Sequence, residues 1–284
     1  MELIKKVGVV GAGTMGAGIA QITAEAGLDV VLVDLEEKFV NRGMENILKN
    51  WNKAVKKGNR TDEEIDQIKL RLTGTTNYDN LKDCQLIIEA VVEKMSIKKE
   101  LFGKLDRICP ADTIFASNTS ALSITELAAS TSRPTTVIGV HFFNPVPAMK
   151  LVELIPGAET TAKTVATMKE FCNTIGKEAI PVKESPGFIV NRLLIPYINE
   201  AAILFDHGVA SAAEIDQAMK LGANMPMGPL ALADLIGIDV CLMIMEYFFN
   251  EMADSKYRPA LSFRQKVRAG HLGRKTGRGF FDYN

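Results

Sequence analysis

Short apolar runs alternate with longer amphipathic stretches over the first 185 residues of the chain. The apolar runs predict strands, expected at residues 7–10, 29–33, 86–90, 112–116, 136–140, 150–155 and 179–182. Between them, apolar positions recur near helical spacing and predict helices at residues 17–26, 36–57, 61–72, 94–108, 123–129 and 161–175. This regular alternation predicts an α/β fold with a doubly wound, Rossmann-type parallel sheet.

A helical hairpin and a helical second domain depart from this alternation. The helices at 36–57 and 61–72 follow each other directly and predict a hairpin inserted into the first domain. Pro186 and Gly187 mark a boundary between domains 1–185 and 186–284. The second domain is expected to be all-helical, with helices at residues 188–205, 212–221, 229–248 and 259–268. Because two of its stretches are apolar on more than one face, we expect a homodimer through this domain and leave a higher oligomer open.

Composition and charge narrow the possible partners. The formal net charge of −1 gives no overall field that attracts nucleic acid or an anionic membrane. The apolar stretch 229–245 carries Asp234 and Asp239, so it indicates one or two buried helices rather than a membrane span. Four cysteines lie far apart and are not spaced like metal ligands or a redox pair. With no signal-peptide pattern at its start, the sequence predicts a reduced, cytoplasmic protein without a metal.

A glycine turn follows the first predicted strand and leads into a predicted helix. Its sequence is Gly11-Ala12-Gly13-Thr14-Met15-Gly16. Gly11 permits the tight turn, Gly13 lets the backbone approach a pyrophosphate, and Gly16 lets the helix lie close to the strand. The N–H groups at the helix start, which include those of Thr14 and Met15, face the anion. The alternative is a purely structural strand–turn–helix.

The cofactor preference depends on Asp34, at the end of the second predicted strand and eighteen residues past Gly16. A carboxylate at that position accepts hydrogen bonds from the adenine ribose hydroxyls, and it would repel the extra phosphate of NADP. We therefore expect the turn and Asp34 to bind NAD. The alternative for Asp34 is an ordinary surface residue.

Polar residues follow three predicted strands, at Glu93, at residues 117–120 and at His141. Ligands of a doubly wound sheet bind beyond the carboxyl ends of its strands, so these residues predict a site. His141 is a candidate general base, because imidazole titrates near neutral pH. Glu153, on the next predicted strand, could fix its tautomer and stabilise the imidazolium. The alternatives are a structural histidine and a solvated glutamate.

Neutral hydrogen-bonding groups and a basic cluster complete the candidate residues. Ser120 could bond a ligand or cap the helix after it. Asn191, among apolar residues early in the first helix of the second domain, needs either a ligand or a hydrogen bond at the domain interface. The hairpin carries a basic cluster that is either a solvated face or an anchor for a phosphate, formed by Lys53, Lys56, Lys57 and Arg60.

The motifs, taken in order, resemble those of the L-3-hydroxyacyl-CoA dehydrogenases over the whole chain. They are the glycine turn, Val91-Val92-Glu93, Ser117-Asn118-Thr119-Ser120, His141-Phe142-Phe143-Asn144-Pro145, Pro186-Gly187-Phe188-Ile189-Val190-Asn191-Arg192, Gly228-Pro229 and Gly277-Arg278-Gly279-Phe280-Phe281. Within that family the sequence is most similar to the compact bacterial enzymes that act on 3-hydroxybutyryl-CoA in butyrate formation.

The resemblance implies a reaction and its residues. The implied reaction is the reversible, NAD(H)-dependent reduction of acetoacetyl-CoA to (S)-3-hydroxybutyryl-CoA, within short-chain fatty acid metabolism. His141 matches the catalytic histidine and Glu153 the carboxylate paired with it, and Ser120 and Asn191 match residues that bond the substrate oxygens. Two other interpretations stay open: a dehydrogenase of free hydroxy acids, and a protein that binds NAD without turnover.

The resemblance also implies binding residues. Glu93 and Lys98 match positions near the nicotinamide side of the cofactor, and Asn118 of the polar cluster is expected to join them. The hairpin resembles the region that holds the 3′-phosphate of CoA, which favours the anchor interpretation for Lys53, Lys56 and Lys57 without indicating which lysine makes contact.

Overall fold

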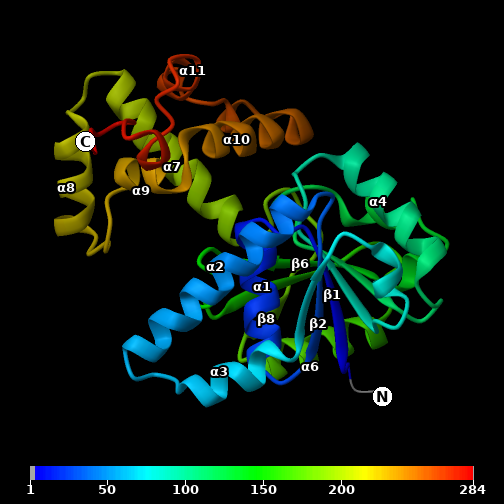
Figure 1. Ribbon diagram of the computed structural model, residues 1–284. Coiled ribbons are helices and arrows are strands. Elements are labelled where there is room, and N and C mark those ends of the chain that lie inside the picture. Colours follow the sequence, from blue (N-terminus) through cyan, green and yellow to red (C-terminus); the bar gives the residue numbers. More distant parts are fainter. Residues whose placement is uncertain (1–3, 284) are drawn as a thin grey trace. The chain divides into compact units, whose positions relative to one another are not determined.

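One sheet of eight strands forms the centre of the first unit of the structure (Figure 1). The computed structural model describes residues 4–283, and the chain divides into two units between Glu184 and Ser185. The strands are β1 (Lys6–Val10), β2 (Asp29–Val33), β3 (Leu72–Thr75), β4 (Leu86–Glu89), β5 (Ile114–Ser117), β6 (Val137–Phe142), β7 (Leu151–Pro156) and β8 (Glu178–Pro181). Residues 1–3 and 284 of the two expected domains lie outside the described residues.

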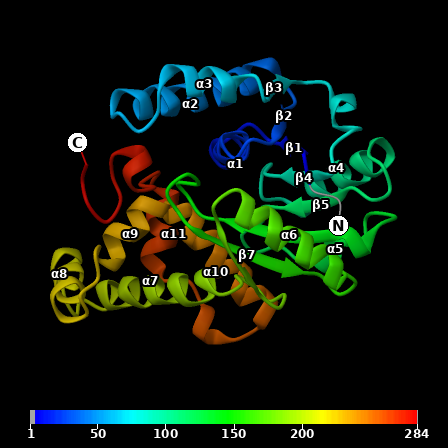
Figure 2. The ribbon, with the colours of Figure 1, turned by 90° about the horizontal axis from the view of Figure 1, so that it is seen from below.

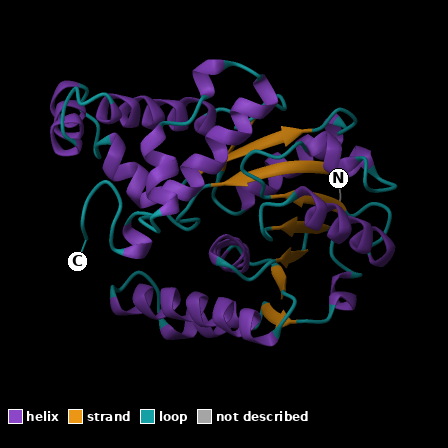
Figure 3. Ribbon diagram, turned by 90° about the horizontal axis from the view of Figure 1, so that it is seen from above, coloured by secondary structure: helices purple, strands orange, loops and turns teal. Residues whose placement is uncertain are grey.

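The strand order across the sheet is β3-β2-β1-β4-β5-β6-β7-β8. Figure 3 shows the strands of the sheet in orange, with helices on both sides of them. Strands β1 to β6 pair in parallel, whereas β7 is antiparallel to β6, and β8 is parallel to β7. The expected α/β class with a doubly wound, mostly parallel sheet is confirmed, and among the described strands the one departure from the parallel arrangement is the β6–β7 pair. The connection 143–150 is too short for a crossover helix, so the chain reverses there. Strand β3 was missed, because its polar sequence Leu-Thr-Gly-Thr lacks an apolar run.

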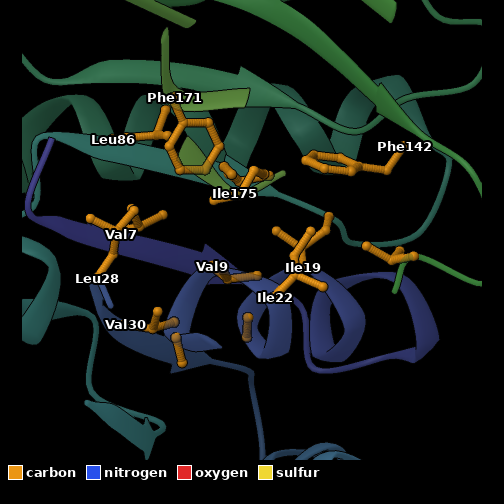
Figure 4. Close-up of a cluster of buried hydrophobic side chains, with 14 of the residues drawn as sticks. Val7, Val9, Ile19, Ile22, Leu28, Val30, Leu86, Phe142, Phe171 and Ile175 are labelled. Carbon is orange, nitrogen blue, oxygen red and sulfur yellow. The ribbon is translucent and has the colours of Figure 1, made fainter. Parts of the chain in front are cut away.

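Helices cover both faces of the sheet. The described helices of this unit are α1 (Thr14–Glu25), α2 (Glu37–Lys56), α3 (Asp62–Lys69), α4 (Met95–Ile108), α5 (Ile124–Ala128) and α6 (Ala162–Thr174), with 3₁₀ turns η1 (Tyr78–Leu81) and η2 (Pro134–Thr136). One core lies between the sheet and helices α1 and α6 (Figure 4); its buried side chains include Val7, Val9, Ile19, Ile22, Phe142 and Phe171. On the other face, Phe102 of α4 meets Phe115 of β5 edge to face, with ring centroids 5.6 Å apart.

The expected helical hairpin is formed by α2 and α3 (Figure 2). Thr61 caps α3 and makes a reciprocal capping box with Glu64, which satisfies two backbone N–H groups at the helix start. The hairpin packs on helix α1 and strand β3 through the apolar face of α2. There the buried Trp51 also donates its indole N–H to Glu25 Oε1 of α1, at 2.7 Å.

The second unit is helical, as expected. Its elements are α7 (Val190–Asp206), α8 (Ala212–Gly222), α9 (Pro229–Ile236), α10 (Ile238–Met252), η3 (Ser255–Tyr257), α11 (Leu261–Arg268) and η4 (Arg274–Thr276). Residues 229–248 form two helices rather than one, because Gly237 adopts φ 108° and separates α9 from α10. No helix within residues 4–283 combines the length and the apolarity needed to cross a membrane.

A buried aspartate ties the C-terminal segment to the helices of the second unit. Asp234 of α9 is 1% exposed. Its carboxylate accepts hydrogen bonds from the backbone N–H groups of Phe280 and Phe281, at 2.8 and 2.9 Å, and from the Tyr283 hydroxyl at 3.1 Å. A Cβ on Gly279 would lie 1.9 Å from Asp234 Oδ1, so only glycine allows this close approach. The C-terminal segment 279–283 therefore wraps around the Asp234 carboxylate, and this arrangement is called the clasp below.

Candidate functional site

The glycine turn has the geometry that an anion-binding turn requires. Gly11 adopts φ 103°, and a Cβ on it would lie 2.5 Å from the carbonyl oxygen of Ala90. A Cβ on Gly16 would lie 1.7 Å from the Gly11 carbonyl oxygen, whereas a Cβ on Gly13 would meet nothing within 4 Å. Helix α1 begins at Thr14 rather than at residue 17, so the first helical N–H groups belong to the turn itself. The open side at Gly13 is where a phosphate can approach the backbone.

Asp34 is bound to the glycine turn. One carboxylate oxygen accepts the N–H of Ala12 at 2.6 Å, and the other accepts the N–H of Leu35 at 2.7 Å. A cavity of about 810 Å³ lies beside the turn and Asp34 and is also lined by Arg42, Tyr78 and Lys104. Burial, with the Asp34 charge as a smaller cause, raises the pKa of Tyr78. The size of the cavity, the open Gly13 and the half-buried carboxylate fit a dinucleotide.

His141 and Glu153 form a buried pair across two strands. They occupy directly opposite positions of the antiparallel pair β6–β7, and His141 Nδ1 lies 2.7 Å from Glu153 Oε2. His141 is 5% exposed and Glu153 is 0% exposed. The expectation that His141 lies past the end of its strand was wrong, since β6 continues to Phe142. A carboxylate in its ionised form can only accept a hydrogen bond, which would assign the ring hydrogen to Nδ1 and make Nε2 the candidate for proton exchange.

The polar cluster at the end of β5 is held by the side chain of Glu93 and by a backbone N–H of β6. Glu93 Oε1 accepts the hydroxyl of Thr119 at 2.5 Å and the N–H of Ser120 at 2.8 Å. Asn118 Oδ1 accepts the N–H of Phe142, the residue after His141, at 2.9 Å. The cluster is thereby linked to the strand that carries His141.

Ser120 is not the cap of the following helix. Ser123 caps α5, with its hydroxyl accepting the Glu126 N–H at 3.1 Å, which removes the capping alternative for Ser120. Ser120 is half-buried in the turn that precedes the cap. Its expected contact with a substrate stays a prediction.

Sequence reasoning missed Glu89, the last residue of β4. Its side chain is fully buried and lies 2.6 Å from the ammonium of Lys98, which is 1% exposed. The same ammonium lies 3.2 Å from Glu93. The signal in the sequence was an acidic residue at the end of an otherwise apolar run, 86–90, which a strand tolerates only with a partner.

The remaining candidates belong to other elements of the chain. Asn191 is half-buried in the first turn of α7, in the second unit. Lys53 and Lys56, in the last turns of α2, line a surface cavity of about 410 Å³, and Lys57 follows as the C-cap residue of that helix. Among residues 4–283, no group of three or more His, Cys, Asp or Glu side chains is placed to hold a metal ion.

Comparison with known proteins gives full-length matches. The family described as "3-hydroxyacyl-CoA dehydrogenase, NAD binding domain" matches residues 6–185, and "3-hydroxyacyl-CoA dehydrogenase, C-terminal domain" matches residues 187–283. A 3-hydroxybutyryl-CoA dehydrogenase of Clostridioides difficile is 53% identical, over 98% of this chain and 99% of the relative. The mitochondrial hydroxyacyl-coenzyme A dehydrogenase of Mus musculus is 43% identical, over 99% of this chain and 92% of the relative.

A solved structure has the same fold as this chain. The crystal structure of an (S)-3-hydroxybutyryl-CoA dehydrogenase from Ralstonia eutropha superimposes with a TM-score of 0.96 at 49% sequence identity. The match covers 99% of both chains.

Proposed function

The chain belongs to the NAD-dependent 3-hydroxyacyl-CoA dehydrogenase family, and from this premise we propose that it catalyses the reversible reduction of acetoacetyl-CoA to (S)-3-hydroxybutyryl-CoA. The observation that carries the chemistry is the buried pair of His141 and Glu153, 2.7 Å apart on adjacent strands. The choice of a four-carbon substrate is supported by relatives of similar length that bear that name. Formation of butyrate and a cytoplasmic location belong to the same proposal.

The protein's part in the reaction is to hold and move one proton. NADH, when bound, supplies the hydride that reduces the 3-keto carbon. The imidazolium of His141 donates a proton from Nε2 to the oxygen of the substrate as negative charge develops there. Glu153 stabilises the imidazolium, and in the reverse direction the neutral imidazole accepts the hydroxyl proton. General acid–base catalysis of this kind contributes ~10²–10⁴ in rate.

Neutral donors assist the same oxygen. In the proposal the Ser120 hydroxyl and the Asn191 amide hydrogen-bond to the substrate oxygens and so stabilise the charge that builds up in the transition state. The glycine turn holds the pyrophosphate and Asp34 the adenine ribose, with Glu93, Lys98 and Asn118 on the nicotinamide side. The exposed ammonium groups of the α2 end anchor the CoA phosphate; they belong to Lys53, Lys56 and Lys57.

We further propose that the second unit forms a homodimer. Large apolar side chains on its helices are exposed, among them Leu193 at 70%, Met243 at 41% and Phe249 at 38%. A partner chain that covers them would remove this surface from water. Analytical ultracentrifugation of the purified protein tests the point, and a monomer at micromolar concentration would contradict it.

Initial rates with matched substrates test the function. We expect NADH-dependent turnover of acetoacetyl-CoA to exceed that of free acetoacetate by orders of magnitude in kcat/KM, because only the thioester carries the CoA handle. His141→Gln should bind NADH normally in a fluorescence titration while kcat falls ~10²-fold or more. A preference for the free acid would overturn the substrate assignment, and an active His141→Gln variant would overturn the role of His141.

The cofactor preference has its own test. Because of the negative charge of Asp34, we expect kcat/KM with NADH to exceed that with NADPH. An efficiency with NADPH equal to or above that with NADH would contradict the role given to Asp34.

A further inference from the structure

Glu89 is a fully buried carboxylate at the carboxyl end of β4 that the proposed reaction does not use. It is 0% exposed, and both of its oxygens accept hydrogen bonds. Oε1 accepts the Lys98 ammonium at 2.6 Å and the N–H of Val91 at 2.7 Å. Oε2 accepts the hydroxyl of Ser117, the last residue of β5, at 2.6 Å. One side chain thus connects strand β4, helix α4 and the end of strand β5.

The connection continues through Lys98 to Ser120. The Lys98 ammonium also lies 3.2 Å from Glu93 Oε2, so two carboxylates share one cation. The other oxygen of Glu93 accepts the Ser120 N–H at 2.8 Å. Glu89 therefore reaches Ser120 through two charged links, while through Ser117 it holds the opposite end of the same turn.

The turn between these two anchor points is also fixed to β6. Asn118 Oδ1 accepts the N–H of Phe142, which follows His141 directly. The backbone N–H of Asn118 in turn donates to the Glu89 carbonyl oxygen at 2.7 Å. Main-chain and side-chain groups of Glu89 thus both hold the segment 117–120. This segment carries Ser120, one proposed substrate contact, and is hydrogen-bonded to the residue that follows His141, another proposed contact.

Stability alone does not explain this group of three ionisable side chains, of which Glu89 and Lys98 are fully buried and Glu93 is partly buried. Removing charges from water is unfavourable, and apolar residues of the same volume are often no less stabilising than a buried ion pair. What hydrogen-bonded charges add is direction, because each bond constrains both distance and angle. A site that must align a hydroxyl with an imidazole needs that constraint.

We infer that Glu89 is a positioning residue: acting through Lys98 and Glu93 on one side and through Ser117 on the other, it fixes the placement of Ser120 relative to His141. The inference rests on the proposed function, in which both residues act on the substrate oxygen. It assigns Glu89 no contact with substrate or cofactor.

Two substitutions of Glu89 and a double-mutant cycle test the inference. Glu89→Leu keeps the approximate volume and removes every acceptor. We expect kcat with acetoacetyl-CoA at saturating NADH to fall about tenfold or more, as loss of hydrogen bonds to charged groups typically does. Glu89→Gln keeps an acceptor oxygen for Lys98 and should restore most of the lost kcat. In the Ser120→Ala background, Glu89→Leu should lower kcat less than about threefold, because the group it positions is gone.

A matched control comes from the same helix. Asp106, near the other end of α4, forms an ion pair with the buried Arg133, with Oδ1 and Nε 2.6 Å apart, and has no hydrogen bond or ion pair to the groups above. Asp106→Asn should lower the melting temperature and leave kcat unchanged. Hydrogen–deuterium exchange supplies a readout other than turnover: the amides of residues 117–122 should exchange faster in Glu89→Leu and at the normal rate in Asp106→Asn.

The outcomes separate the inference from the function on which it rests. If Ser120→Ala alone keeps normal turnover, the proposed role of Ser120 fails. If Ser120→Ala lowers kcat, and Glu89→Leu lowers kcat by the same factor in the Ser120→Ala background as in the unaltered protein, Glu89 does not act through Ser120. A loss confined to KM for NADH would also overturn the inference, since it would place the effect in the cofactor site. If Glu89→Leu fails to fold, Ser117→Ala is the variant to measure, because it removes only the hydrogen bond to Glu89 Oε2. A normal kcat in Ser117→Ala would then overturn the inference.

Discussion

Replacing Glu153 by glutamine keeps the shape of the side chain and an acceptor oxygen for His141 Nδ1, and removes the charge. A hydrogen bond to a charged partner contributes about 1.5–3 kcal/mol, and one between neutral groups about 0.5–1.5 kcal/mol. Because both side chains are buried and 2.7 Å apart, solvent screens little of this difference. We therefore expect the imidazolium to lose about 1.4 kcal/mol of stabilisation, which corresponds to about one pH unit.

The sign of the shift follows from the protonation state that each direction needs. Reduction needs the protonated ring, so in Glu153→Gln the alkaline limb of its kcat/KM profile should move about one unit to lower pH. Oxidation needs the neutral ring, so its acidic limb should move the same way. Initial rates from pH 5 to 10 in both directions measure this. Glu178→Gln, which removes an exposed carboxylate from the neighbouring strand β8, should leave both profiles unchanged.

Two results would refute this reasoning. One is a Glu153→Gln profile that superimposes on that of the unaltered protein. The other is a loss of kcat/KM from Glu153→Gln that is as large in the His141→Gln background as in the unaltered protein. Because the carboxylate acts only through the imidazole ring, it should have nothing left to stabilise once the ring is gone.

Three further predictions concern the turn, the clasp and the thiols. Gly16→Ala should weaken NADH binding at least ~tenfold in a fluorescence titration and lower the melting temperature measured by calorimetry. Gly13→Ala should weaken NADH binding without lowering the melting temperature. Equal melting temperatures in the two variants would contradict this prediction. Asp234→Asn should lower the free energy of unfolding by ~2–4 kcal/mol in urea and expose the C-terminal segment to trypsin; an unchanged cleavage rate would count against the clasp. Burial raises the pKa of three thiols from 9.0 to about 12, so each thiol's stabilisation is complete below pH 9 and falls by ~1.4 kcal/mol per pH unit up to about pH 12. These thiols belong to Cys84, Cys172 and Cys241. Urea unfolding under reducing conditions between pH 9 and 12 should show that the free energy of unfolding falls less steeply with pH in Cys172→Ala than in the unaltered protein. Equal slopes in the two proteins would refute the prediction.

The fold was predictable from sequence where local chemistry determines geometry. The glycine turn required residues without Cβ at Gly11 and Gly16, and both positions would clash with backbone oxygen atoms if substituted. The capped start at Thr61 was readable from its spacing to Glu64. The helical second unit followed from periodicity alone.

Other features could not be predicted, because they depend on what lies nearby in space. The apolar alternation of residues 150–155 indicates a strand without giving its direction, so the reversal at β7 was missed. The separation of α9 from α10 at Gly237 lies inside a continuous apolar pattern. Lys98 was expected near the cofactor, but nothing in the sequence revealed Glu89 as its partner nine residues earlier, on another element.

The reversal at β7 also has a consequence for how this protein can change over evolutionary time. His141 and Glu153 are aligned by the backbone ladder of two neighbouring strands, so substitutions among surrounding apolar residues can accumulate without separating them. A single inserted or deleted residue within either strand would instead rotate one partner to the opposite face of the sheet. Lineages that keep the chemistry can therefore vary widely in core composition but should keep the length of these two strands.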